Sequence, residues 1–335
     1  MFRPEPPQTR PPSTTRREWG LSSPGLGLSL GGAQGPDQAA RHRRLIELAE
    51  TLELHSVWLP EMHFQPGVCP APLVELAGHA ATTRRLRLGT TSLLLPLHPP
   101  ETLAVEIATL DRLSGGRLLV GLGRGFQKPM LEAFGVPPAQ KRDRFDDALA
   151  RMRAVWAAGR DGASTRPHPP LAVAAFGPKG LAQAARHGLP YLASPVETFD
   201  QIAENQRHHR DQLPEGDPEP LQLLMRTLFV STDAKEQEAA RSALRREMSG
   251  QRRGMPAAVD RALDAPLEDR ALVGSPDQVL ERLLVERQRI GIDLLVTRPL
   301  IANVAEEALE RSLRLLAEEV WPRFRARAPQ PATDA

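Results

Sequence analysis

The sequence predicts an α/β protein in which eight parallel strands close into a (β/α)8 barrel. Short apolar segments alternate with amphipathic segments of helical length along almost the whole chain. The apolar segments show no polar alternation, as expected for parallel strands buried between a barrel interior and an outer layer of helices. None is followed by the glycine fingerprint of a dinucleotide fold, since GLGRG at 121–125 is too short and follows the fourth strand. An open, doubly wound sheet would give a similar alternation, and the count of eight favours the closed barrel.

The expected elements follow one another in a regular order. The strand segments are 25–30, 56–61, 85–96, 118–125, 171–175, 190–195, 221–231 and 292–297. The helical segments are 41–54, 72–83, a stretch around 103–110, 141–157, 180–188, 197–212, a stretch from 233, 276–290 and 304–320. In the segment 141–157, Phe145, Leu149, Met152 and Trp156 recur at helical spacing, which predicts one face buried against the sheet.

Three regions fall outside this alternation. Residues 1–24 hold six prolines and several arginines but few apolar side chains, so we expect a disordered tail before a barrel domain of residues 25–324. Residues 325–335 are expected to form a second loose tail. The segment 248–272 is charged and irregular and contains no convincing strand, which predicts an insertion after the seventh strand, either a lid or an added helix.

Composition excludes several classes of protein. The 43 basic and 41 acidic residues leave a net charge of only +2, so neither nucleic acid nor an anionic membrane is an expected partner. No apolar run approaches the roughly 18 residues of a membrane span, and the first twenty residues lack the apolar centre of a secretory signal. The single cysteine, Cys69, excludes an internal disulfide framework and a multi-thiolate metal site. We therefore expect a cytoplasmic protein without a metal site.

Polar residues stand at the ends of several predicted strands. Glu61 and His63 follow the second strand, Thr90 and Thr91 lie in the third, and Arg124 follows the fourth. The carboxyl ends of parallel barrel strands meet at one mouth, where such proteins keep their sites. We therefore expect these side chains to converge there.

Two segments have features of a phosphate site. Gly177, Lys179 and Gly180 form a strand-to-helix turn, which would present backbone N–H groups and the positive end of a helix to an anion. An ordinary turn with a solvated Lys179 is the alternative. Arg124 has glycine on both sides, so its planar guanidinium could grip a phosphate or carboxylate without crowding, although a surface arginine would also fit.

Two histidines are candidates for proton transfer. His63 lies two residues after Glu61, so the pair could move a proton, or His63 could hydrogen-bond a neighbouring loop. His98 lies among prolines in PLHPP, a rigid loop that could present it either to a ligand or to water.

Several blocks, taken together in this order, resemble the bacterial luciferase-like flavin monooxygenases. The blocks are 56–64, 85–100, 110–125, 134–156 and 173–195. The resemblance implies a TIM-type, luciferase-like barrel that binds flavin mononucleotide (FMN) or a deazaflavin at its C-terminal mouth.

The resemblance also implies roles for individual residues. Thr90 and Thr91 correspond to the position where such proteins often have a non-prolyl cis peptide beside the flavin ring. Arg124 would contact the flavin phosphate, and the turn 177–180 would supply backbone donors to it. Met62 replaces the first of two histidines that commonly follow the glutamate, so light emission is not expected, and His98 stands one place early in its loop.

These points together predict a flavin-dependent monooxygenase that uses reduced FMN, delivered by a separate reductase, and dioxygen to oxygenate a small organic substrate. His63, Glu61 and His98 are the catalytic candidates, with His63 preferred for proton handling. A deazaflavin-dependent oxidoreductase that transfers hydride remains an alternative, as does a non-catalytic flavin-binding subunit. We expect a homodimer, although no feature of the sequence fixes the oligomeric state.

Overall fold

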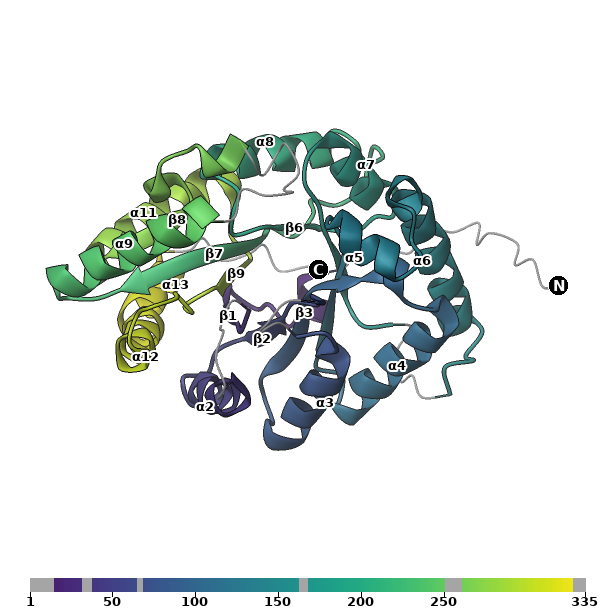
Figure 1. The fold of residues 1–335 in the computed structure, drawn as a ribbon, viewed down its shortest axis with the longest axis horizontal. Coiled ribbons are helices and arrows are strands. Elements are labelled where there is room, and N and C mark those ends of the chain that lie inside the picture. The colour runs from purple at the N-terminus through teal and green to yellow at the C-terminus, as the bar shows by residue number, and fades with distance from the viewer. Residues whose placement is uncertain (1–14, 32–37, 65–68, 163–167, 251–260, 328–335) are drawn as a thin grey trace.

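The computed structural model describes residues 15–31, 38–64, 69–162, 168–250 and 261–327 (Figure 1). Within these ranges eight parallel strands form a closed ring in the order β1, β2, β3, β4, β5, β6, β7, β9 and back to β1. The predicted barrel is therefore confirmed. The ring strands are β1 (Gly25–Ser29), β2 (Ser56–Leu59), β3 (Arg87–Leu94), β4 (Leu118–Gly123), β5 (Leu171–Ala174), β6 (Tyr191–Ala193), β7 (Leu223–Val230) and β9 (Leu294–Thr297).

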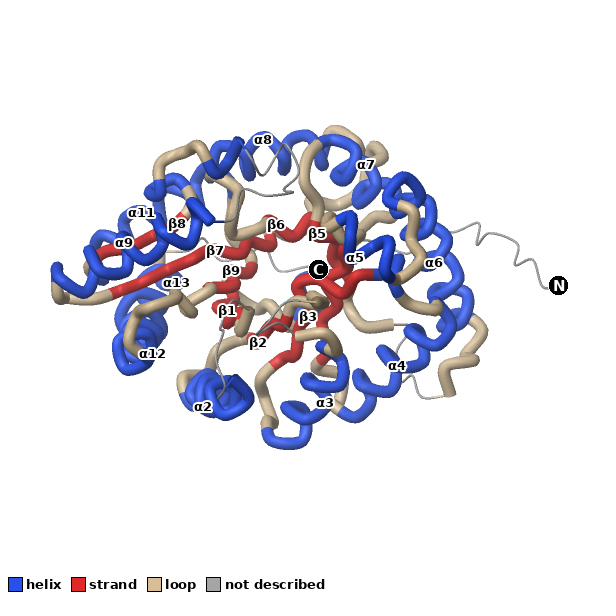
Figure 2. The backbone as a smooth tube through the Cα atoms, in the orientation of Figure 1, coloured by secondary structure: helices blue, strands red, loops and turns tan. Residues whose placement is uncertain are grey.

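Helices surround the ring on its outside (Figure 2). The longer ones are α2 (Gln38–Thr51), α3 (Pro72–Thr82), α4 (Pro100–Leu113), α6 (Lys141–Ala157), α7 (Pro178–Arg186), α8 (Phe199–Arg210), α9 (Ala234–Gly250), α11 (Pro276–Ile290) and α12 (Glu306–Leu315). The shorter ones are α1 (Arg16–Trp19), α5 (Lys128–Ala133), α13 (Trp321–Ala326), the 3-10 turns Leu95–Leu97, Pro138–Gln140 and Leu267–Asp269, and a π-helical turn, Leu316–Val320. Among the described helices, none combines the length and apolar character needed to cross a bilayer.

The helix predictions hold best where the sequence pattern is strongest. Helix α6 has the predicted bounds, and Phe145, Leu149, Met152 and Trp156 are buried. Helix α11 also begins and ends as predicted, and Ser275 caps it through a reciprocal pair of hydrogen bonds with Gln278.

A ninth strand, β8 (Ala271–Gly274), lies outside the ring. The first half of β7 pairs with β6 and β9, whereas its second half leaves the ring and pairs with β8. Figure 1 shows β7 reaching outward beyond the other strands. The expectation of no strand in 248–272 is therefore wrong at its end, because the few apolar residues of β8 form a strand only against the extension of β7. Residues 251–260 of that segment lie outside the described residues.

The barrel has its own interior core, separate from the layer between ring and helices. Trp58 of β2 is fully buried there, and Trp19 of α1 stacks on it with ring centroids 6.3 Å apart. Helix α1 is capped by Thr15, so the expectation of a disordered tail over residues 1–24 is wrong for the part from Thr15 onward. The polar, proline-rich composition of residues 1–24 gave no indication that Trp19 would be fully buried against Trp58. Residues 1–14 and 328–335 lie outside the described residues.

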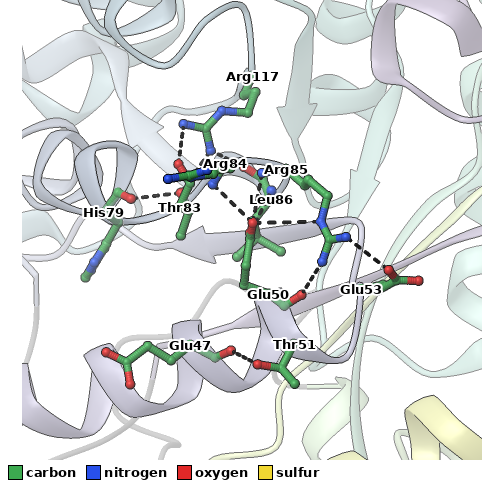
Figure 3. A network of polar contacts seen from close by, with 10 residues as sticks. All are labelled: Glu47, Glu50, Thr51, Glu53, His79, Thr83, Arg84, Arg85, Leu86 and Arg117. Carbon is green, nitrogen blue, oxygen red and sulfur yellow. Dashed lines mark hydrogen bonds and ion pairs between the residues drawn. The ribbon is translucent and has the colours of Figure 1, made fainter.

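At the end of the barrel opposite the mouth, the carboxylate of Glu50 binds the backbone just before β3 begins (Figure 3). Glu50 of α2 accepts hydrogen bonds from the backbone N–H groups of Arg84 and Arg85 at 3.1 and 3.0 Å and from that of Leu86 at 3.0 Å. Burial alone would raise the pKa of Glu50, but these three donors outweigh it and hold the pKa below its ordinary value of 4.5. Helix α2 is thereby tied to the start of β3.

The variant Glu50→Gln should lower the free energy of unfolding at pH 7 by about 2 kcal/mol, because the amide replaces a charged acceptor of backbone donors. Because the folded-state pKa is depressed, the wild-type advantage is present above pH 4.5 and is lost as pH falls through the folded-state pKa. Denaturant titrations at several pH values measure both effects. Glu47→Gln on the same helix is the matched control, and an equal loss in both variants would contradict this role.

Candidate active site

A cavity of about 410 Å³ opens at the C-terminal mouth of the barrel. Residues at or just after the ends of ring strands line it, as in other barrels whose sites lie at this face. The lining includes Ser29, Thr91, Ser92, Gly123, Arg124, Ala174, Ala193, Met225 and Arg298. Apolar walls are added by Pro60, Leu94, Phe126, Phe176, Leu192 and Pro195.

The cavity is strongly cationic. The basic residues among its lining are Arg124, Lys141, Arg142, Lys179 and Arg298. Among the described residues that line it there is no aspartate or glutamate. A cavity of this kind favours a ligand that carries negative charge on an apolar body.

Arg124 and the start of α7 are fitted to each other. The Nη1 atom of Arg124 lies 3.3 Å from Oε1 of Gln183, and its guanidinium lies over Gly180. A Cβ at position 180 would overlap Nη2 of Arg124 and lie 3.0 Å from Cβ of Ala175, so a larger residue there would push the guanidinium aside. Burial lowers the pKa of Arg124 to about 10, with a further contribution from Arg142, and the group remains a cation at neutral pH. Arg124 and Gly180 therefore meet in the cavity wall, as the sequence predicted.

Two further cations, Lys141 and Arg142, were missed by sequence reasoning. They occupy the first turn of α6, and Nζ of Lys141 donates to the carbonyl oxygen of Gly125 at 3.1 Å. Burial lowers the pKa of Lys141, as do the neighbouring Arg124 and Arg142. Cations are disfavoured at the positive end of a helix dipole, so two of them in the first turn were the sequence signal that could have marked them as candidate site residues.

The third strand places its two threonines differently. Thr91 lines the cavity, and its buried Oγ1 has no hydrogen-bond partner among the described residues. Thr90 does not line the cavity, because its fully buried hydroxyl donates to the carbonyl oxygen of Gly121 at 2.9 Å. The cis peptide bond joins Thr91 and Ser92, one residue later than expected. Thr91 and Ser92, rather than Thr90 and Thr91, therefore face the ligand space.

The turn after β5 contributes unevenly to the cavity. Lys179 and Gly180 line it, whereas Gly177 does not. Gly177 has a φ of 69° and precedes α7, and its carbonyl oxygen accepts the first helical hydrogen bonds, from Gly180 and Leu181. The contribution of Gly177 is therefore to the backbone path of the turn.

The three catalytic candidates form one cluster. Oε1 of Glu61 lies 2.7 Å from Nε2 of His63, and Nε2 of His98 lies 3.0 Å from both carboxylate oxygens. None of the three lines the cavity. The cluster lies directly behind its wall, since the backbone of Glu61 donates to Ser92 and Oε2 of Glu61 accepts from the N–H of Leu94 at 2.6 Å.

The Glu61 carboxylate has no exposed surface. Burial alone would raise the pKa of Glu61. A hydrogen bond and positive charge from His98, and hydrogen bonds from the Leu94 N–H and from His63, outweigh burial, so the pKa lies below its ordinary value. His63 also packs on Phe134, with ring centroids 4.7 Å apart. Glu61 and His63 can therefore hold a proton between them, beside the mouth. In the described ranges, no set of three His, Cys, Asp or Glu residues is arranged to hold a metal ion.

Comparison with known proteins agrees with this geometry. The profile of the luciferase-like monooxygenase family matches residues 20–294. The chain belongs to this family. The chain superposes on the crystal structure of monooxygenase RslO1 from Streptomyces bottropensis with a TM-score of 0.75 and 28% sequence identity. The superposition covers 90% of this chain and 99% of RslO1. The family assignment predicted from the sequence blocks is confirmed, and with it the oxidoreductase class.

Two other proteins similar to this luciferase-like chain are described with different cofactors. The oxygenating constituent of 3,6-diketocamphane monooxygenase from Pseudomonas putida, solved in complex with FMN, shares the fold at 18% identity, with a TM-score of 0.74 over 90% of this chain and 98% of that one. A Mycobacterium tuberculosis protein provisionally named a coenzyme F420-dependent oxidoreductase is 33% identical over 170 residues, 48% of this chain and 45% of that one. Uncharacterised mycobacterial relatives are 46% identical over 85 residues, and the chain spans only 30% of their length.

Proposed function

We propose that this luciferase-like chain is the oxygenase of a two-component system, binding reduced FMN supplied by a separate reductase and using dioxygen to oxygenate a small organic substrate. The observation that carries the proposal is the group of four cations, Arg124, Lys141, Arg142 and Lys179, at one end of an apolar cavity. A phosphate at one end of a planar, largely apolar body matches this arrangement.

The donor set fits a phosphate in detail. Arg124 offers a planar fork, and Gly180 lets its guanidinium pack against the start of α7. Lys141 and Arg142 come from the first turn of α6. The partnerless hydroxyl of Thr91 offers a hydrogen bond further along the cavity. When bound, reduced flavin supplies the reducing equivalents and the reaction with dioxygen. The protein residues hold its phosphate, orient its ring and keep water from it.

Water exclusion is the second contribution of the protein. The apolar side chains of Leu94, Phe126, Phe176, Leu192 and Met225 line the cavity. Side chains of this kind offer no hydrogen bonds, so water is not retained against them. An oxygenase needs such a wall, because water and its protons promote loss of the activated oxygen as hydrogen peroxide before the substrate reacts.

Oxygen uptake tests the proposal against the deazaflavin alternative, which the mycobacterial relative favours. Purified chain, an FMN reductase and NADH should consume dioxygen in proportion to product formed from a small-molecule panel. Hydride transfer from a reduced deazaflavin to the same panel, with no oxygen uptake, would overturn the proposal and support the alternative. Flavin binding with neither reaction would support a non-catalytic subunit.

His63 is proposed to handle a proton at the mouth. Glu61 remains ionised near neutral pH and fixes the His63 ring at 2.7 Å. His63→Ala should lower product formed per dioxygen consumed about tenfold or more, within the range of general acid–base catalysis, and change FMN affinity less than twofold. His208→Ala on α8 is the control. A large loss of FMN affinity in His63→Ala would instead assign His63 a structural role.

A further inference from the structure

A second anion-binding position lies across the mouth from the first. Arg124 follows β4, and Arg298 follows β9. Four strand steps separate β4 from β9 in either direction around the eight-stranded ring, so these two arginines stand at opposite sides of it. The other lining cations belong to the β4 and β5 side, in α6 and α7. A single phosphate held by that group does not account for Arg298.

Arg298 is held rigidly but keeps unused donors. Its Nε lies 3.2 Å from Oγ1 of Thr227, and its Nη1 lies 2.6 Å from Oε1 of Glu247. Its backbone N–H donates to the carbonyl oxygen of Arg226 at 2.7 Å. A guanidinium carries five N–H donors, so three remain, and Nη2 takes no partner among the described residues. The side chain is only 17% exposed.

The surroundings of Arg298 select the kind of ligand. Glu247 holds the guanidinium but does not line the cavity, whereas Arg298 does. The lining residues on this side of the ring are small or apolar, among them Ser194, Pro195 and Met225. A fixed guanidinium beside an apolar wall is suited to one planar anionic group on an apolar molecule.

We infer that Arg298 binds the carboxylate of the substrate, which makes the substrate class an organic acid with an apolar body. This inference rests on the proposed function, since it concerns the substrate of the same cavity. With the cofactor phosphate at the β4 side and the acid group at the β9 side, the apolar lining of the cavity between them would take the apolar body of the substrate.

The competing role for Arg298 is structural, because its ion pair with Glu247 joins the end of β9 to α9. The two roles predict different behaviour for two variants. If Arg298 only holds α9, then Arg298→Gln and Glu247→Gln should have the same effects. If Arg298 binds a carboxylate, Arg298→Gln loses acid binding, whereas Glu247→Gln retains or strengthens it because the guanidinium loses its competing anion.

The test measures binding of benzoate and octanoate, each against its amide, by calorimetry on the full chain with and without FMN. Wild type should bind each acid at least tenfold more tightly than its amide. Arg298→Gln should abolish that difference, Arg298→Lys should keep part of it, and Glu247→Gln should keep all of it. FMN affinity should change less than twofold in Arg298→Gln, and Arg151→Gln, which removes an exposed arginine paired with Glu101, is the matched control.

Equal binding of acid and amide by wild type would overturn the inference, and so would parallel loss of acid binding in Arg298→Gln and Glu247→Gln. Failure of the proposed function gives a different pattern. The chain would then bind no FMN, while preference for the acid over its amide could still be measured without cofactor. Preference for the acid that persists in Arg298→Gln would place the anion site at the β4 side instead.

Discussion

Arg124→Gln is expected to weaken FMN binding about a hundredfold. The guanidinium lies over Gly180 at the start of α7 and remains charged with a pKa of about 10. Its contact with a phosphate is a charge-assisted hydrogen bond in a partly buried site, worth about 3 kcal/mol at the upper end of the usual range, which corresponds to about two decades in affinity. Quenching of FMN fluorescence on titration with protein measures the change.

Arg151→Gln is the control for this prediction, because Arg151 is an exposed arginine of α6 that pairs with Glu101 and does not line the cavity. Riboflavin, which lacks the phosphate, supplies a second control, since its affinity should be the same for wild type and Arg124→Gln. A variant that binds FMN as tightly as wild type would show that the phosphate lies elsewhere.

Gly89→Ala should cause a large loss of stability by overpacking the barrel interior. A Cβ at position 89 would overlap the ring of Trp58, which is fully buried and stacked on Trp19. Neither ring can move without displacing the interior core, so the free energy of unfolding should fall by about 3 kcal/mol. Chemical denaturation of wild type and variant gives the difference directly.

Gly78→Ala is the matched control, because Gly78 lies within α3 and nothing lies within 4 Å of the added Cβ. That variant should be neutral or up to about 1 kcal/mol more stable, since alanine is the better helix former. Trp58→Leu should relieve the overlap, so the double variant should lose less than the sum of its two single variants. Additive losses would mean that the cost of Gly89→Ala does not come from Trp58.

The sequence predicted the layout of the barrel because parallel strands and amphipathic helices are local patterns. Helices α6 and α11 could be placed to the residue from apolar spacing and a cap. Strand β8 and helix α1 could not, because their stability comes from distant partners: the outward extension of β7 supports β8, and Trp58 supports Trp19. Neither partner is visible in the local sequence.

The candidate site was likewise predictable only where local sequence determines it. Strand ends predicted that Arg124, Lys179 and Gly180 lie at the mouth, and they line the cavity. Which of two neighbouring residues faces inward depends on strand alternation and on the register shift between Thr91 and Leu93, so Thr90 was misplaced. Glu61 and His63 were predicted at the mouth and do meet, and His98, whose loop could have faced a ligand or water, joins them. A strand end alone could not reveal that the backbone of Ser92 and Leu94 separates them from the cavity.

The central claim is that the cationic end of the cavity holds a flavin phosphate. Anaerobic titration of the purified chain with reduced FMN, oxidised FMN, riboflavin and the deazaflavin coenzyme F420, followed by absorbance and fluorescence, tests it most directly. We predict saturable binding of reduced FMN and at least a hundredfold weaker binding of riboflavin. Equal affinity for FMN and riboflavin, or no spectral change with any flavin, would contradict the claim.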